Sequence, residues 1–225
     1  MLNEIERDFI LIHILFAVIC VVILTLLISL SIGIKLFILV IIYNSIIPLF
    51  GAWRKHEEWI NIWLFSFILS IFQIWPDWFL SAELNILVFP DDGLFKIGTV
   101  SGYMLFLWAI PFFIIIFTGK QIQERYSKQK SYWFVGLISF LIFGISEMTI
   151  WMIGSWYAQN VHMIGNAAIY ILIPEIILGL STFHGYEKIK GKQMWCKILI
   201  AFVIMLLYLG SAGFFYFLIE RVLYM

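Results

Sequence analysis

The sequence predicts an all-α, polytopic integral membrane protein with seven transmembrane helices. Hydrophobic residues make up 63% of the 225 residues and charged residues only 12%, whereas soluble domains average about 45–50% apolar and about 25% charged residues. Apolar runs of about 20 residues recur along the chain, and each is long enough to cross a hydrocarbon core of about 30 Å as a helix. These runs lack the alternation of apolar and polar residues that a membrane β-barrel needs, so the barrel class is excluded.

The apolar runs set the positions of the seven helices within one domain, residues 1–225. The first run is preceded by Glu4, Glu6 and Asp8, where a secretory signal would carry positive charge, and it is longer than a signal segment. We therefore expect it to be retained as the first span. The expected spans lie near residues 9–31, 34–53, 59–80, 99–118, 132–155, 163–185 and 198–219.

The distribution of Lys and Arg predicts the orientation, because positive charge is retained on the cytoplasmic side of a membrane. With the N-terminus inside, only three of the fourteen basic residues fall outside, namely Lys35, Lys96 and Arg221. The other eleven fall inside: Arg7, Arg54, Lys55, Lys120, Arg125, Lys128, Lys130, Lys188, Lys190, Lys192 and Lys197. An odd number of spans then places the C-terminus outside. We expect a multi-pass protein of the cytoplasmic membrane of a prokaryote.

Two proline motifs suggest an internal repeat. Ile110-Pro111 lies in the fourth span and Ile173-Pro174 in the sixth, and both spans run from outside to inside. Spans three to four and five to six would then be parallel two-helix repeats, at 59–118 and 132–185, which is a common construction in membrane proteins.

Two glutamates at membrane depth are the first candidates for function. A carboxylate at the centre of a span costs about 2.5–3.5 kcal/mol on insertion scales, so it usually faces a partner or a cavity. Glu147 lies about 22 Å from the inner start of span five, and Glu175 about 18 Å from the outer start of span six, directly after Pro174. Both are expected in the outer half of the membrane, where they could line one cavity. Desolvation at that depth favours a protonated carboxyl group.

The alternative for both glutamates is a purely structural role. Each could hydrogen-bond to a neighbouring helix and hold the bundle together. The polar partners available within the spans or at their ends are Asn44, Gln73, Ser146 and Asn166.

A third acid lies at the outer boundary. Asp77 stands between Trp75 and Trp78 at the end of span three, and Trp at an interface is routine in membrane proteins. The following connection contains Asp91 and Asp92, which with Asp77 could form an acidic rim for a cation or a polar head group. Turn chemistry is the competing explanation for Asp91-Asp92-Gly93.

Other functional classes are excluded or unsupported. The four histidines and two cysteines share no metal-ligand spacing, so we expect no metal site, and no motif indicates a cofactor. The net charge of zero gives no indication of nucleic-acid binding. The last span has no lysine, which excludes a retinal Schiff base there. The sequence does not indicate an oligomeric state.

The order of these motifs resembles the integral-membrane lycopene cyclase domain and is similar in outline to small transmembrane terpene cyclases. That family pairs a Pro-Trp-Asp type element with a Pro-x-Glu-Glu type element and two phenylalanines. Here Trp75-Pro76-Asp77 is followed by a connection of about 25 residues and then by a helix with Pro111-Phe112-Phe113. A further, shorter match to the proline-containing elements lies at Pro174-Glu175. The resemblance covers residues 70–115 and 172–176. Phe112 and Phe113 replace the acidic pair, so only Asp77 and Glu175 carry over.

The resemblance and the buried acids together lead to three hypotheses. The leading one is a membrane-embedded enzyme, an isoprenoid cyclase or isomerase, that protonates a lipophilic substrate with Glu147, Glu175 or Asp77. Aromatic faces would stabilise the resulting carbocation. The alternatives are a proton- or cation-coupled transporter and a non-catalytic assembly subunit, and membrane lipid is an expected partner in each case. The predicted substrate-binding residues are Trp75, Trp78, Trp108, Trp151, Tyr170, Asn166, Asp91 and Asp92.

Overall fold

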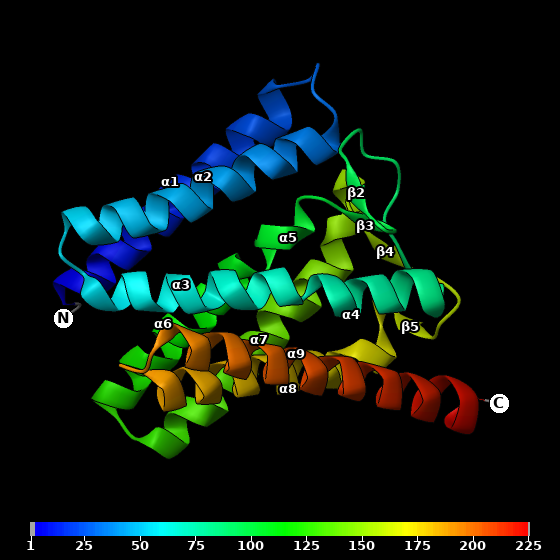
Figure 1. The fold of residues 1–225 in the computed structure, drawn as a ribbon. Helices are drawn as coiled ribbons and strands as arrows, with labels where there is room; N and C mark the ends of the chain where they lie inside the picture. Colours follow the sequence, from blue (N-terminus) through cyan, green and yellow to red (C-terminus); the bar gives the residue numbers. More distant parts are fainter. Residues whose placement is uncertain (1–2, 225) are drawn as a thin grey trace.

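The computed structural model describes residues 3–224 and confirms the all-α class, with seven helices long and apolar enough to cross a membrane. Four of the seven long helices consist of two or three consecutive segments (Figure 1). The helical segments are α1 (Glu4–Leu26), α2 (Ile32–Trp53), α3 (Glu57–Phe72) with α4 (Ile74–Trp78) and η1 (Phe79–Glu83), α5 (Met104–Leu107) with α6 (Ala109–Arg125), α7 (Lys128–Thr149) ending in η2 (Ile150–Ile153), α8 (Ile169–Ile189), and α9 (Met194–Tyr216) ending in η3 (Phe217–Leu223).

The first helix begins earlier than the hydrophobic run predicts, at Glu4 rather than at residue 9. Asn3 caps this helix: its side chain accepts a hydrogen bond of 2.8 Å from the backbone of Glu6, whose carboxylate in turn accepts one from the backbone of Asn3. Acidic residues in a first turn are also favoured by the helix dipole. The acidic segment is therefore part of the first helix, because polar residues can start a helix when they cap its first turn.

Two short β-hairpins delay the starts of the fourth and sixth long helices, which were predicted at residues 99 and 163. Strand β2 (Lys96–Ile97) pairs with β3 (Val100–Ser101), and β5 (Met163–Ile164) pairs with β6 (Ala167–Ala168). Gly98 and Gly165 occupy the turns at φ of 62° and 64°, a conformation that favours glycine. Both predicted repeat segments therefore contain a hairpin before their second helix, although the repeat itself stays a prediction.

A third strand pair joins two connections that are distant in sequence. Strand β1 (Leu87–Val88) pairs with β4 (Tyr157–Ala158), and the side chain of Gln159 donates hydrogen bonds to the backbone and side chain of Asn85. We call residues 84–103 and 154–168 the cap, because they cover one end of the helix bundle (Figure 1). The opposite end, with the N-terminus and the connections 54–56, 126–127 and 190–193, is called the basic end.

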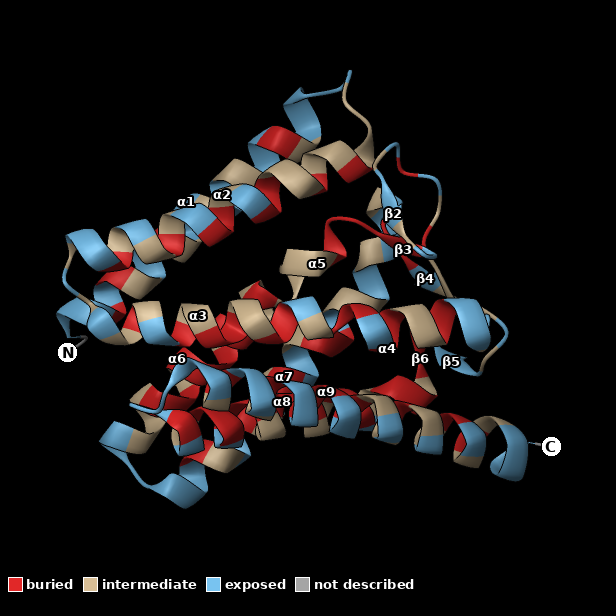
Figure 2. Ribbon diagram, in the orientation of Figure 1, coloured by how far each residue is buried: buried red, intermediate tan, exposed pale blue. Residues whose placement is uncertain are grey.

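The most buried part of the bundle lies between α3, α6, α8 and α9 (Figure 2). Trp59, Phe112 and Phe183 are fully enclosed there. Gly179 of α8 allows a close approach to α7, since a Cβ atom at this position would overlap the side chain of Ser139. Helix α1 lies at the edge of the bundle, and most of its apolar side chains are exposed.

Charged side chains at the basic end form ion pairs. Lys120 has only 7% of its side chain exposed, and its Nζ atom lies 2.8 Å from Glu58 Oε1 and 3.7 Å from Glu187 Oε1. Lys190 approaches Glu58 at 2.9 Å, and this hydrogen bond raises the pKa of Lys190. These contacts connect α3, α6 and the end of α8.

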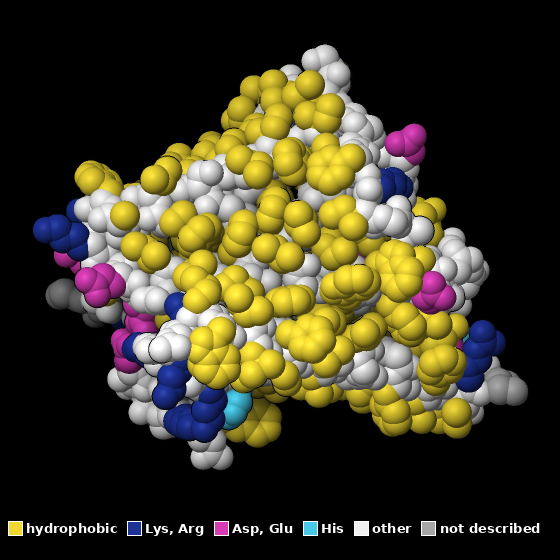
Figure 3. Space-filling model, viewed as in Figure 1, with side chains coloured by type: hydrophobic (Ala, Val, Ile, Leu, Met, Phe, Trp, Pro, Cys, Tyr) yellow, Lys and Arg dark blue, Asp and Glu magenta, His cyan; other side chains and the backbone are white. Residues whose placement is uncertain are grey.

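A second group of ion pairs joins α1 to its neighbours. The buried Asp8 carboxylate accepts hydrogen bonds from Arg54 at 2.8 Å and from His56 at 3.0 Å. Arg125 pairs with the buried Glu6. Charged groups gather at the two ends of the visible face in Figure 3, whereas apolar side chains cover the band between them.

Candidate functional site

Three carboxyl groups converge beneath the cap. Asp77 comes from α4, Glu147 from α7 and Glu175 from α8, and all three line the same small space. Asp77 and Glu175 are each only 2% exposed, and Glu147 is partly buried. The structure therefore brings the three predicted acids together.

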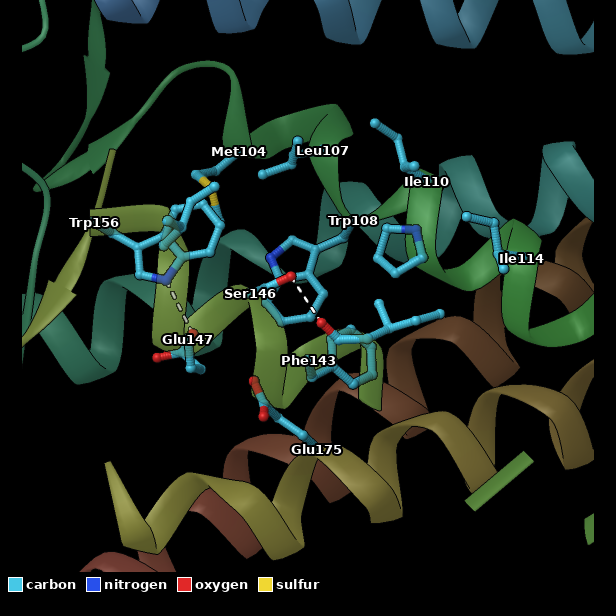
Figure 4. Close-up of a pocket in the computed structure, with 13 residues that line it drawn as sticks. Met104, Leu107, Trp108, Ile110, Ile114, Phe143, Ser146, Glu147, Trp156 and Glu175 are labelled. Atoms are coloured by element: carbon cyan, nitrogen blue, oxygen red, sulfur yellow. Dashed lines mark hydrogen bonds between the residues drawn. The ribbon is translucent and has the colours of Figure 1, made fainter. Parts of the chain in front are cut away.

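The three acids differ in their hydrogen bonds. Trp108 Nε1 donates to Asp77 Oδ2 at 3.0 Å, and Trp156 Nε1 donates to Glu147 Oε1 at 3.0 Å. Glu175 points from α8 towards Glu147 in Figure 4, and its buried Oε2 atom has no hydrogen-bond partner. Within residues 3–224 none of the three acids forms a salt bridge. Glu175 is thus a buried carboxyl group with an unused acceptor atom in a cavity.

The cavity beside these acids has a volume of about 200 Å³ and a mostly apolar wall. Glu147 and Glu175 form one side of it, and Ser146 is the other polar side chain apart from the indoles (Figure 4). Its remaining wall comes from α5, α6, α7, η2 and the cap: Met104, Leu107, Trp108, Ile110, Pro111, Ile114, Ile142, Phe143, Ile150 and Trp156.

A smaller space of about 30 Å³ lies directly between the three carboxyl groups. Tyr170 and Tyr208 also line it, and both residues are nearly fully buried. A volume of this size exceeds the roughly 10–15 Å³ that one water molecule requires, and the surrounding oxygens offer the polar partners that a buried water needs. This space can therefore hold a water molecule beside the three acids.

The two spaces are closed at both ends of the bundle. Leu87 and Phe89 from one part of the cap and Ala158 and Ala168 from the other cover the smaller space. Towards the basic end, Phe112 and Leu178 are fully buried. The larger cavity lies between α6 and α7, which both contribute to its wall. The lining residues Ile110, Pro111 and Ile114 of α6 and Ile142 and Ser146 of α7 are only partly buried, so we infer that the cavity opens at the side of the bundle.

The structural alternative for the two glutamates receives no support from their predicted partners. The amide of Asn44 donates to the backbone of Val40 and Phe106, and Ser146 donates to the backbone of Ile142. The side chain of Gln73 is buried without a hydrogen bond. None of the predicted interhelical bonds to Glu147 or Glu175 is formed; instead, Glu147 bonds to Trp156 of the cap.

Five of the predicted site residues line the two spaces, namely Asp77, Trp108, Glu147, Tyr170 and Glu175. Four others line neither of the two spaces. Trp75 is 56% exposed on the outside of the bundle. Trp78 packs against the turn at Gly98. Trp151 and Asn166 line a separate surface pocket. Residues at the end of a span face every direction, so proximity in sequence to an acid does not place an indole in the cavity.

Asp91 and Asp92 also lie outside the cavity walls, and the structure favours the turn explanation for both. Asp91 Oδ1 accepts a hydrogen bond from the backbone of Gly93, and Asp92 Oδ1 accepts one of 2.9 Å from the backbone of Leu94. Asp92 is buried against the first turn of α2, where its backbone oxygen accepts a hydrogen bond from Gly33. These residues attach the cap to α2.

Most of the cavity-lining residues that were not predicted from the sequence lie outside the helices that carry the three acids. Trp156 lies in the cap, and Tyr208 lies in the middle of α9. Phe143 of α7 faces Trp108 with a ring distance of 5.5 Å. Phe143 lies one helical turn from Glu147, and that spacing is a signal that could have identified it. Within the described residues, no group of three His, Cys, Asp or Glu side chains could hold a metal ion.

A comparison with known protein families identifies the family of this chain. A family profile described as a domain of unknown function, DUF6989, matches residues 74–219. The chain belongs to this family. The matched region contains Asp77, Glu147 and Glu175 together with the whole cap, whereas it leaves out α1, α2 and α3. No curated protein and no solved structure gives a significant match.

Proposed function

We propose that the protein spans the membrane seven times with its basic end in the cytoplasm and its cap outside. The seven apolar helices and the apolar band between two charged ends support insertion (Figure 3). The orientation rests on the excess of Lys and Arg at the basic end: eleven of the fourteen basic residues of the sequence belong to the segments that meet there. In this orientation the three acids lie in the outer half of the bilayer.

We further propose that the protein is a membrane-embedded enzyme that starts the cyclisation or isomerisation of a lipophilic isoprenoid by protonating it. The observation that carries this proposal is the buried, unpartnered carboxyl group of Glu175 at the wall of an apolar, aromatic-lined cavity. A carboxyl group without structural bonds is free to give its proton to a substrate. The resemblance of the Trp75-Pro76-Asp77 and Pro174-Glu175 elements to membrane cyclases indicates an isoprenoid as the substrate class.

The proposed reaction is balanced without a cofactor. The Glu175 carboxyl group transfers its proton to a carbon of an alkene or to the oxygen of an epoxide, which leaves a carbocation on the substrate. The π electrons of a second alkene form the new carbon–carbon bond, and the cation moves to the ring. Loss of a proton from an adjacent carbon to a carboxylate restores an alkene. The product is an isomer of the substrate, and the enzyme has gained and lost one proton.

The other cavity residues have distinct roles in this scheme. The ring faces of Trp108, Phe143 and Tyr208 can stabilise a passing positive charge. Asp77 and Glu147 are held in place by indole hydrogen bonds, which makes them the candidates for accepting the final proton. The space of about 30 Å³ between the three acids can hold a water molecule that returns this proton to Glu175.

The side opening matches a substrate that is dissolved in the membrane. Because the cap and the packed core close the two ends, the route between α6 and α7 leads to the region that the bilayer occupies in the proposed orientation. A long apolar chain could place one end in the cavity while its remainder stays among the lipids.

The proposal is tested by incubating the purified protein in lipid nanodiscs with linear polyprenyl and epoxy-polyprenyl compounds and analysing the extracts by mass spectrometry with chromatography. We expect a product of unchanged mass and altered retention. Glu175→Gln should reduce its rate at least about 100-fold, the lower range for loss of a general acid. Glu83→Gln, which changes an exposed acid near the cap, is the matched control and should retain the full rate.

The alternatives give different results in the same system. If no product forms and Glu175→Gln instead abolishes a flux driven by a pH gradient in proteoliposomes, the protein is a proton-coupled carrier. If neither turnover nor flux occurs and Glu175→Gln changes only stability, the assembly-subunit hypothesis is favoured. Both results would contradict the proposed enzyme.

A further inference from the structure

The three acids of the cavity lack a positive partner. Within residues 3–224 no Lys, Arg or His lies within salt-bridge distance of Asp77, Glu147 or Glu175. All three line one small space, so ionisation of any two of them would bring like charges close together, and in surroundings of low dielectric constant that repulsion is large. A cation in the larger cavity, beside Glu147 and Glu175, would relieve it.

We propose that this cavity is a binding site for lipophilic ammonium ions, that is, for a protonated or quaternary amine on an apolar chain. The acidic cluster is supported by a second observation, since the Oε2 atom of Glu175 is buried, has no partner and faces the cavity (Figure 4). This proposal concerns binding alone and goes beyond the proposed enzyme activity, because it does not need the ligand to react.

Aromatic rings continue the site away from the acids. Among the lining residues, the ring of Trp108 lies 5.5 Å from that of Phe143 and 6.1 Å from that of Tyr208. A carboxylate on one side and aromatic faces on the other is the arrangement that recognises alkylated ammonium groups, through cation–π attraction and exclusion of water. The wall thus provides what a poorly hydrated cation requires.

The size of the cavity selects among cations. Its volume of about 200 Å³ is larger than the roughly 150 Å³ of an engineered cavity that accepts benzene, so it accommodates a trialkylammonium group with the first carbons of its chain. The rest of the chain can leave through the side opening. A metal ion fits less well: hard cations require about six oxygen ligands, and no metal-binding group of three side chains exists in the described part of the chain.

The proposal is tested by titrating the protein in phosphatidylcholine nanodiscs with N,N-dimethyldodecylamine at neutral pH and following tryptophan fluorescence. We expect saturable binding, because Trp108 and Trp156 border the site. The neutral analogue 1-dodecanol should not displace the amine. Glu175→Gln should weaken binding at least tenfold, and Glu147→Gln serves as a second variant in case the first does not fold. Glu83→Gln should bind as tightly as the unmodified protein.

Several outcomes overturn the proposal. Equal binding by the unmodified protein and both cavity variants would show simple partitioning into lipid, and displacement by 1-dodecanol would show an apolar site without charge recognition. The result is independent of turnover. Product formation without amine binding would refute the cation site and leave the enzyme proposal intact, whereas amine binding without any product would do the reverse.

Discussion

Two regions of this molecule bury acidic residues, and they treat them in opposite ways. At the basic end, Asp8 is paired with Arg54 and His56, and Glu6 is paired with Arg125. Beneath the cap, Asp77 and Glu175 are equally buried, but none of the acids there has a basic partner within the described chain. The first group holds helices together. The second group keeps ionisable carboxyl groups in apolar surroundings without a basic partner, and such arrangements recur at functional sites.

The largest loss of stability is expected from a substitution at the basic end. Lys120→Met removes the buried ammonium group that lies between Glu58 and Glu187. Glu58 keeps Lys190 as a partner, but Glu187 loses its ion pair, so we expect a loss of about 3 kcal/mol in the free energy of unfolding. Denaturant unfolding in detergent micelles measures this change. Lys192→Met at an exposed position is the control, and an equal loss there would show that the ion pairs contribute nothing specific.

A smaller effect is expected where the cap meets the acids. Trp156→Phe keeps an aromatic ring but removes the donor to Glu147 Oε1. Leaving a buried acceptor unsatisfied costs about 1–3 kcal/mol. Trp195→Phe also removes an indole hydrogen bond, to Gln193, but on the exposed surface, and should cost much less. If both variants unfold at the same denaturant concentration, the bond between the cap and the cavity is not structural.

The attachment of the cap to α2 should contribute about 1 kcal/mol. Asp92→Ala removes the carboxylate that holds the turn through Leu94 and that lies against the start of α2, so both a turn bond and a favourable dipole interaction are lost. Asp91→Ala, at the exposed neighbour, tests turn chemistry alone. Limited proteolysis in the 84–103 segment should increase for the first variant and hardly for the second.

The smallest change in stability, or even a gain, is expected at Glu175. Because its Oε2 atom has no partner, replacing the acid by an amide in Glu175→Gln breaks no hydrogen bond. Glu187→Gln on the same helix weakens the contacts with Lys120 and Gln123 and should destabilise the protein. Thermal unfolding followed by circular dichroism compares the two variants. A larger loss for Glu175→Gln would mean that this acid is structural after all.

The sequence predicted the long helices well because apolar runs of sufficient length have few other uses. It failed where short-range geometry decides the outcome. The hairpins at Gly98 and Gly165 lie inside runs that are apolar enough to join a span, yet both glycines occupy positive φ and turn the chain before the helix begins. Hydropathy does not register a two-residue turn.

The acids of the site were predictable, but most of its wall was not. Asp77, Glu147 and Glu175 stood out because charge is rare in apolar segments. Indole rings are common throughout this chain, with ten Trp residues, so their presence near an acid carries little information. Trp75 faces outward, whereas Trp156 of the cap reaches the cavity. Only the direction of each side chain distinguishes them, and that depends on packing between distant helices.

The pairing of β1 with β4 also has a consequence for how the protein is made. Strand β1 leaves the ribosome long before β4, and α5, α6 and α7 are synthesised between them. Until β4 arrives, the main-chain groups of β1 have only water as their partner, which is tolerable outside the bilayer but not within it. The cap can therefore pair over the cavity only after residue 157 has been made, and in the proposed membrane orientation a chain truncated before this residue would expose an incomplete site.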